Sequence, residues 1–309
     1  MRSRRGNGIT MNPLRALVAP GEQWAPYRGP ARPASPWHGS HARKPWQFGC
    51  EAVIPILDTP DTLPYVIELL RLQRTRPYIV VIDTGSTRKN LDLIRSHQAE
   101  DVEVHSLRLN GVRHPSDFPA IAMDLAMSLC RSEFMFCTHA DVFLRSRDVT
   151  SDLIEMCGPS TPAVGYRITP RDHEDWVEMV SHTCTMLHIP TMDRIGAGWS
   201  LRRLCNNREV RHIPNILGNN WPDTEILINY ILWENGIKAR LIGDEQNHAR
   251  TLDDRIDHCR TLTAGRLYSP EYARKCQGWL DDAIAGARER VAAWRDQDEH
   301  ANSISRIVA

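Results

Sequence analysis

The segment from Phe134 to Leu144 is mostly apolar and carries a His-x-Asp pair, His139 and Asp141. Its apolar residues are typical of a buried strand, so the pair is expected at the carboxyl end of that strand. Ligands bind at this end of the strands in open α/β sheets. An Asp oxygen suits a hard divalent cation, and an imidazole can bind beside it. The pattern predicts a metal or ligand site; alternatively, Asp141 only caps a turn and His139 is a structural histidine.

Two further apolar segments are also followed by an acidic residue. Asp58 follows the segment 52–57, and Asp83 follows the segment 78–82. The turn after 52–57 lacks the Gly-x-Gly-x-x-Gly pattern of a Rossmann dehydrogenase, and no glycine-rich P-loop occurs in the chain. Phosphate groups therefore need another partner, and a metal on the His-x-Asp pair is the candidate.

Strand and helix patterns alternate after residue 50. Continuous apolar strands that alternate with helices predict an α/β fold with a doubly wound, mostly parallel central sheet. A long amphipathic helix is expected to begin at Ser269-Pro270, with serine as the cap and proline at the first position. The expected strands cover 52–57, 78–82, 102–109, 134–137, 164–167, 181–189 and 238–242, and the expected helices 63–72, 91–97, 119–132 and 222–234.

The charge of the chain is distributed unevenly. The 309 residues carry 38 basic and 38 acidic side chains, so no global field favours nucleic acid or a membrane. Residues 1–49 are basic and rich in proline, with Glu22 as their single acid. Such a segment cannot bury enough apolar surface to fold alone, and we expect an extended arm there.

The cysteine pattern and the hydropathy indicate where the protein works. Eight cysteines show neither a Cys-x-x-Cys pair nor zinc-ligand spacing, and several lie in apolar runs. A reducing compartment, the cytoplasm, is therefore expected. No apolar stretch approaches the ~18–20 residues that a membrane-spanning helix needs, so no transmembrane segment is expected.

Several motifs occur together in an order that resembles one known family. Val53-Ile-Pro-Ile-Leu-Asp58 is similar to an opening "V-I-P-x-Y-N" strand, and Val80-Val-Ile-Asp-Thr-Gly-Ser-Thr87 to "V-V-D-D-G-S-T-D". His139-Ala-Asp141 stands in the place of a metal-binding "D-x-D" motif, and Thr224-Glu225 in the place of "E-D". In these features, which cover about residues 50–250, the chain resembles family-2 glycosyltransferases of the GT-A fold.

The resemblance implies roles for the matching residues. It implies a Mn²⁺ or Mg²⁺ cofactor, held by Asp141 with His248 and His139. It implies that Glu225, or Asp223 nearby, is the general base that takes a proton from the acceptor. Trp199, Arg202 and Trp221 are candidates for an acceptor wall. The residues implied in nucleotide-sugar binding are Pro55, Ile56, Asp58, Asp83, Gly85, Ser86, His139, Ala140 and Asp141.

These roles define an expected function and three expected regions. We expect a metal-dependent transfer of sugar from a nucleotide-sugar, favoured as a UDP-sugar, to a hydroxyl acceptor with inversion. The regions are an arm at 1–49, a GT-A catalytic domain at 50–262 and a helical extension at 263–309. Within the domain, 50–145 is the nucleotide-binding half and 146–262 the acceptor half.

The chain departs from the family motifs at three positions, and other functions stay open. His139 replaces the first acid of D-x-D, Thr84 replaces the second acid of "D-D-G-S", and the "E-D" pair reads Thr224-Glu225. A retaining enzyme or an altered metal dependence would fit these changes. The alternatives are a nucleic-acid-modifying glycosyltransferase that uses the basic arm and an inactive sugar-nucleotide-binding module.

Overall fold

The computed structural model describes residues 48–107, 117–168, 179–199, 224–245, 250–259 and 270–308. Almost all of the expected arm lies outside these ranges, so its structure and binding stay predictions.

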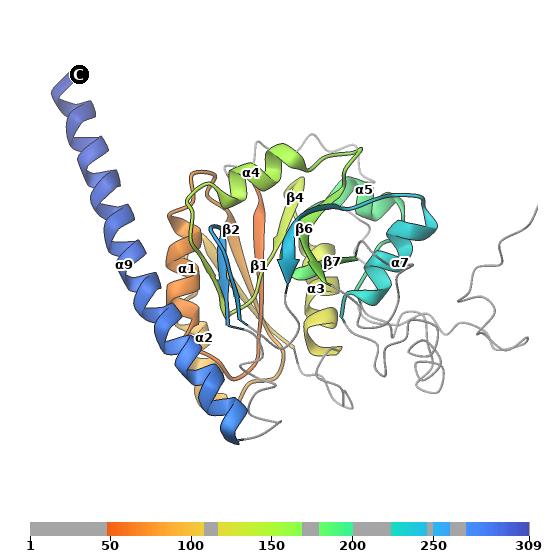
Figure 1. Ribbon diagram of the computed structural model, residues 1–309, viewed down its shortest axis with the longest axis horizontal. Coiled ribbons are helices and arrows are strands. Elements are labelled where there is room, and N and C mark those ends of the chain that lie inside the picture. The colour runs from red at the N-terminus through yellow and green to blue at the C-terminus, as the bar shows by residue number, and fades with distance from the viewer. Residues whose placement is uncertain are drawn as a thin grey trace, which may run out of the picture.

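A seven-stranded sheet runs through the centre of the molecule (Figure 1). Its strands are Glu51–Ile56 (β1), Tyr78–Asp83 (β2), Val102–Ser106 (β3), Phe134–Cys137 (β4), Ala163–Ile168 (β6), Met179–His188 (β7) and Arg240–Glu245 (β8). They lie in the order β3-β2-β1-β4-β7-β6-β8. Only the β4–β7 and β6–β7 pairs are antiparallel. The mostly parallel α/β sheet predicted from the sequence is therefore confirmed.

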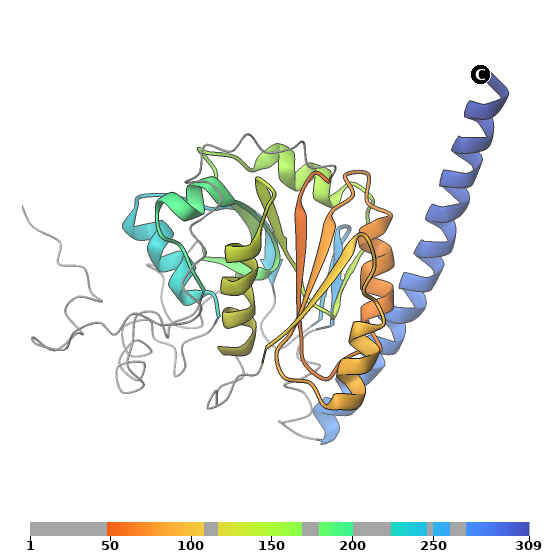
Figure 2. The same ribbon diagram turned by 180° about the vertical axis from the view of Figure 1, so that it is seen from behind.

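Helices cover both faces of this sheet, as Figures 1 and 2 show from opposite sides. One core contains residues of α1 (Leu63–Arg71), α2 (Arg88–Arg95), α4 (Val149–Met156) and α9 (Pro270–Val308). The other contains residues of α3 (Asp117–Leu129), α5 (Ile189–Arg194) and α7 (Ile226–Glu234). Successive β1 side chains enter different cores, Ile54 the first and Val53 the second. Burial on both faces explains why β1 and β2 are continuous apolar runs.

The apolar residues after the His-x-Asp pair belong to a second, three-stranded sheet. Its strands are Val142–Leu144 (β5), Thr251–Leu252 (β9) and Ile256–His258 (β10), in the order β5-β10-β9. The apolar run that begins at Phe134 is thus two strands in two sheets, β4 and β5. The turn between them carries His139 and Asp141, and Val142 donates its backbone N–H to the His139 carbonyl at 3.3 Å. The chain leaves the central sheet where the predicted site residues lie.

The long C-terminal helix begins at Pro270, as the sequence predicted. Its buried residues are spaced three, four or seven positions apart, on one face of the helix, and they pack on the core that contains α1. Tyr65 of α1 accepts hydrogen bonds from Arg288 at 2.9 and 2.7 Å. The last turns of α9 extend past the rest of the domain (Figure 1).

The cysteines of the described ranges carry reduced, buried thiols. Burial raises the pKa of Cys157 to about 12 and raises the pKa of Cys137 and Cys184 further, so these thiols stay protonated. They act as small apolar side chains in the core. No helix in the described part of the chain is both long enough and apolar enough to cross a membrane.

Candidate active site

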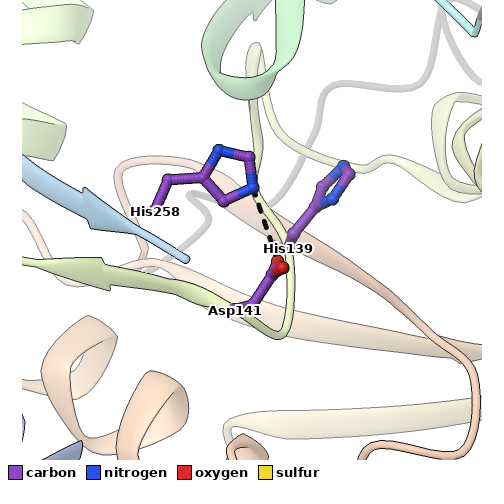
Figure 3. Close-up of side chains that lie close together, drawn as sticks. All are labelled: His139, Asp141 and His258. Atoms are coloured by element: carbon purple, nitrogen blue, oxygen red, sulfur yellow. Dashed lines mark ion pairs between the residues drawn. The ribbon is translucent and has the colours of Figure 1, made fainter. Parts of the chain in front are cut away.

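Three potential metal ligands converge at the carboxyl edge of the central sheet. Ligand atoms of His139, Asp141 and His258 all lie within 4.8 Å of one another. Figure 3 shows the three side chains, with Nε2 of His258 3.6 Å from Oδ1 of Asp141. Asp141 is 8% exposed and His258 5% exposed. A charged carboxylate and two imidazoles gathered in so little solvent favour a bound cation.

Backbone pairing between distant segments brings His258 to this position. His258 lies opposite Val142 in the antiparallel β5–β10 pair, and Cys259 donates its N–H to the Asp141 carbonyl at 3.1 Å. The sequence suggested His248 as the third ligand, but His248 lies outside the described residues. His258 was missed because the two-residue β9 and three-residue β10 are too short to show a periodicity.

The residue after His258 is not a ligand in this arrangement. The Cys259 thiol is buried and donates to the Trp279 carbonyl with a sulfur–oxygen distance of 3.5 Å. Burial, with smaller contributions from Asp257 and Asp141, raises the pKa of this thiol well above its usual range. A metal-binding cysteine must lose its proton, so Cys259 has a packing role here.

The buried carboxylate of Glu245 contacts His258. Oε1 of Glu245, at the end of β8, lies 2.8 Å from Nδ1 of His258 and accepts a 2.8 Å hydrogen bond from the Thr183 hydroxyl. Carboxylates commonly contact the second nitrogen of a metal-binding histidine and hold its ring orientation. Glu245 is therefore placed to leave Nε2 of His258 directed toward Asp141.

The donor set fits a divalent cation of intermediate softness. Two imidazole nitrogens and one carboxylate oxygen suit Mn²⁺ better than Mg²⁺, which prefers oxygen ligands in a near-ideal octahedron. His139 in place of an acid keeps a ligand at that position and reduces the negative charge of the site. The residues present thus fit the metal expected from the sequence.

Hydrogen bonds among the predicted nucleotide-binding residues connect the ends of β1 and β2. The register places Ile56 beside Asp83. Oδ1 of Asp83 accepts the Ser86 N–H at 3.0 Å, and the Ser86 hydroxyl accepts the Asp58 N–H at 2.8 Å. Gly85 has a φ of 121°, which only glycine adopts easily. Asp58, Asp83, Gly85 and Ser86 therefore form one connected turn at the sheet edge.

Two other residues that are predicted to bind the nucleotide-sugar lie at the same edge of the sheet. Pro55 is buried in β1 opposite Ile82, and Ala140 is buried between the two metal-ligand candidates of the β4–β5 turn.

The Asp58 carboxylate makes local hydrogen bonds, since its Oδ1 accepts the Thr87 N–H at 2.8 Å and the Asn90 amide N–H at 2.9 Å. Its positive φ of 53° is unusual for a residue with a side chain and is stabilised by these bonds.

The candidate base Glu225 forms a buried pair with a histidine. Glu225 precedes α7 and is 1% exposed, and its Oε1 contacts Nδ1 of His182 on β7. The His182 ring centroid lies 4.1 Å from that of His139. His182 therefore connects the Glu225 carboxylate to His139 of the metal-ligand cluster. His182 was not predicted as a site residue because it is one of several polar residues along β7.

An asparagine fixes α7 on β7 beside this pair. The Asn229 amide donates to the carbonyls of Val180 at 2.8 Å and Glu225 at 2.9 Å, and its oxygen accepts the Val180 N–H at 2.9 Å. All of these groups are buried, so the hydrogen bonds set the position of Glu225 strongly.

Of the three residues predicted to form the acceptor wall, Trp199 lies within the described residues. Trp199 is completely buried, with its ring centroid 6.2 Å from that of His182, and its backbone N–H donates to Asp124 at 2.9 Å. Arg202, Trp221 and the alternative base Asp223 lie outside the described residues. Their roles stay predictions.

Comparison with known proteins gives one family and a set of distant structures. The model of the family "Glycosyl transferase family 2" matches residues 51–207, just over half of the chain. No curated protein matches. Among solved structures, the mannosyltransferase PcManGT from Pyrobaculum calidifontis, in complex with GDP-Man and Mn²⁺, is 14% identical, with a TM-score of 0.45 over 86% of this chain and 85% of that one.

Two other similar structures come from S. aureus and Drosophila. S. aureus TarS (residues 1–349) in complex with UDP is 14% identical, with a TM-score of 0.39 over 52% of each chain. Drosophila β1,4-galactosyltransferase 7 with manganese, UDP-Gal and xylobiose is 11% identical, with a TM-score of 0.39 over 69% of this chain and 71% of that one. The family match, the order of the motifs and the mostly parallel sheet agree: the chain belongs to glycosyl transferase family 2 and is a glycosyltransferase of the GT-A type.

Proposed function

We propose that this enzyme transfers a sugar from a UDP-sugar to a hydroxyl acceptor, with Mn²⁺ as its cofactor and with inversion at the anomeric carbon. The observation that carries the proposal is the convergence of His139, Asp141 and His258 at the edge of the sheet where the Asp83 turn also lies. The reduced, buried cysteines support action in a reducing compartment, the cytoplasm.

Each group at this edge has a proposed part in the transfer. Asp141, His258 and His139 would hold the cation. When bound, it would neutralise the charge that builds on the departing nucleoside diphosphate. Asp83 accepts an N–H of the base and so fixes the donor. Glu225 takes the proton of the acceptor hydroxyl as that oxygen attacks, and its contact with His182 holds the carboxylate in place.

A thermal-shift screen tests the donor and the ion together. The purified chain is melted with UDP, GDP, CMP or dTDP, each with Mn²⁺, Mg²⁺ or EDTA. A ligand at a hundredfold excess over its dissociation constant stabilises the folded state by about 2.7 kcal/mol. We expect UDP with Mn²⁺ to give the largest rise in melting temperature and Mg²⁺ a smaller one. Equal melting curves with every nucleotide, with or without metal, would contradict the proposal.

We expect Asp83→Ala to weaken donor binding far more than it slows turnover at saturation. Contacts to the base are made equally in the ground and transition states, so their loss raises KM and leaves kcat nearly unchanged. Loss of a hydrogen bond to a charged group is worth about 1.5–3 kcal/mol, or about 10- to 160-fold in KM. Steady-state kinetics measures both constants. The control variant is Asp92→Ala, which changes an exposed residue of α2. A lower kcat with an unchanged KM would contradict this role of Asp83.

A further inference from the structure

The β9–β10 hairpin, which carries His258, is very short. β9 has two residues and β10 has three, and their register pairs His258 with Thr251 and Asp257 with Leu252. The pairing of β10 with β5 completes a sheet of three short strands. A sheet this small needs packing against other elements for its stability. The position of His258 therefore depends on side-chain contacts of the hairpin.

An arginine closes the open end of this hairpin. Arg250 directly precedes β9, and its Nε and Nη2 donate to the two carboxylate oxygens of Asp257, each at 2.7 Å. The two side chains are only 17% and 4% exposed. A two-point contact between a guanidinium and a carboxylate fixes their relative orientation as well as their distance. The pair thus joins the start of β9 to β10, one residue before His258.

The same face of the hairpin contacts the helix α9. Successive side chains of a strand point to opposite faces, so Asp257 and Cys259 lie on the face opposite to that of His258. The Cys259 thiol donates to a backbone carbonyl of α9 with a sulfur–oxygen distance of 3.5 Å. Nη1 of Arg250 lies 3.4 Å from Oδ2 of Asp282, which also belongs to α9. Arg250 therefore contacts β10 and α9 together, on the far side of β10 from the metal-ligand cluster.

We propose that Arg250 is a positioning residue for the metal site. By holding Asp257, it fixes the backbone of β10 so that the His258 imidazole keeps its place beside Asp141 (Figure 3). The proposal rests on the proposed function, because it takes this cluster to be the cation site. The family model matches residues 51–207, so the family match assigns no role to the hairpin or to α9.

The test measures the melting temperature of the full chain against the Mn²⁺ concentration, at a fixed concentration of UDP and with EDTA as the metal-free point. Arg250→Lys keeps the charge but loses the fork. We expect it to need about ten times more Mn²⁺ than the wild type for the same rise, at the low end of the range for contacts that orient a metal ligand. Arg255→Lys makes the same change at a partly exposed arginine of the same hairpin and should respond like the wild type.

Two further variants separate positioning from a contribution to stability alone. Asp257→Asn keeps the shape of the side chain and removes its charge, so it should also need more Mn²⁺. His258→Ala removes the ligand itself. Arg250→Lys should cause no additional loss of the Mn²⁺ response when it is combined with His258→Ala, because a positioning residue acts through the ligand that it positions.

A wild-type response to Mn²⁺ in both Arg250→Lys and Asp257→Asn would overturn the proposal, even if these variants melted lower in EDTA. Arg250 would then only stabilise the fold. A tenfold loss from Arg250→Lys that persists in the His258→Ala background would overturn it as well. A wild type that gives no response to Mn²⁺ would instead contradict the proposed function, and this proposal with it.

Discussion

Replacing Asp141 with asparagine is expected to reduce sugar transfer at least about a thousandfold while the protein stays folded. Asp141 supplies the only anionic oxygen of the three-residue cluster, and a hard cation depends on it. Metal stabilisation of a leaving group is worth several kcal/mol, and each 1.36 kcal/mol is tenfold in rate. Transfer assays at saturating Mn²⁺ and calorimetric titration of Mn²⁺ and UDP measure the two losses.

The control for this variant is a second Asp→Asn change at the other end of the molecule. Asp152 is an exposed residue of α4, the helix that precedes β6 and so lies at the amino ends of the parallel strands. Asp152→Asn should keep full activity and metal binding. Wild-type turnover and UDP affinity in Asp141→Asn would show that Asp141 only shapes the turn between β4 and β5.

Replacing Glu225 with glutamine should lower turnover by about 10²- to 10⁴-fold while UDP binding persists. This range is the usual contribution of general acid–base catalysis. Glutamine keeps the shape of the side chain and can still contact His182, but it cannot accept the acceptor's proton. Asp223→Asn should cost distinctly less, through its effect on the start of the helix. The reverse ranking would assign the base to Asp223.

A second glutamate–histidine pair provides the control for loss of the contact between Glu225 and His182. Oε1 of Glu133 lies 3.1 Å from Nε2 of His188 at the amino end of β4, and the Glu133 side chain is 58% exposed. Glu133→Gln should leave turnover unchanged. A loss below about tenfold in both Glu225→Gln and Asp223→Asn would contradict inversion, because it falls short of the general-base range. The product would then keep the anomeric configuration of the donor, which NMR detects.

Local patterns predicted most of the fold correctly. β1 and β2 are apolar along their whole length because both faces are covered, and such runs are visible in a sequence. The start of α9 at Pro270 and its buried face also follow from local spacing and capping preferences. The His-x-Asp pair was recognised because it interrupts an apolar run.

Long-range pairing brings together the site residues that local patterns did not predict. His258 reaches Asp141 through the β5–β10 pairing, which joins segments far apart in the chain. The contacts of Glu245 with His258 and of His182 with Glu225 likewise join different elements. No local pattern contains such partners.

A crystal structure with UDP-sugar and Mn²⁺ tests the central claim most directly, because the anomalous signal of manganese locates the ion. We predict a single strong peak among Asp141, His258 and His139, with the diphosphate against it and the base beside Asp83. A peak on other residues, or a nucleotide bound away from the ends of β1, β2 and β4, would contradict the proposed active site.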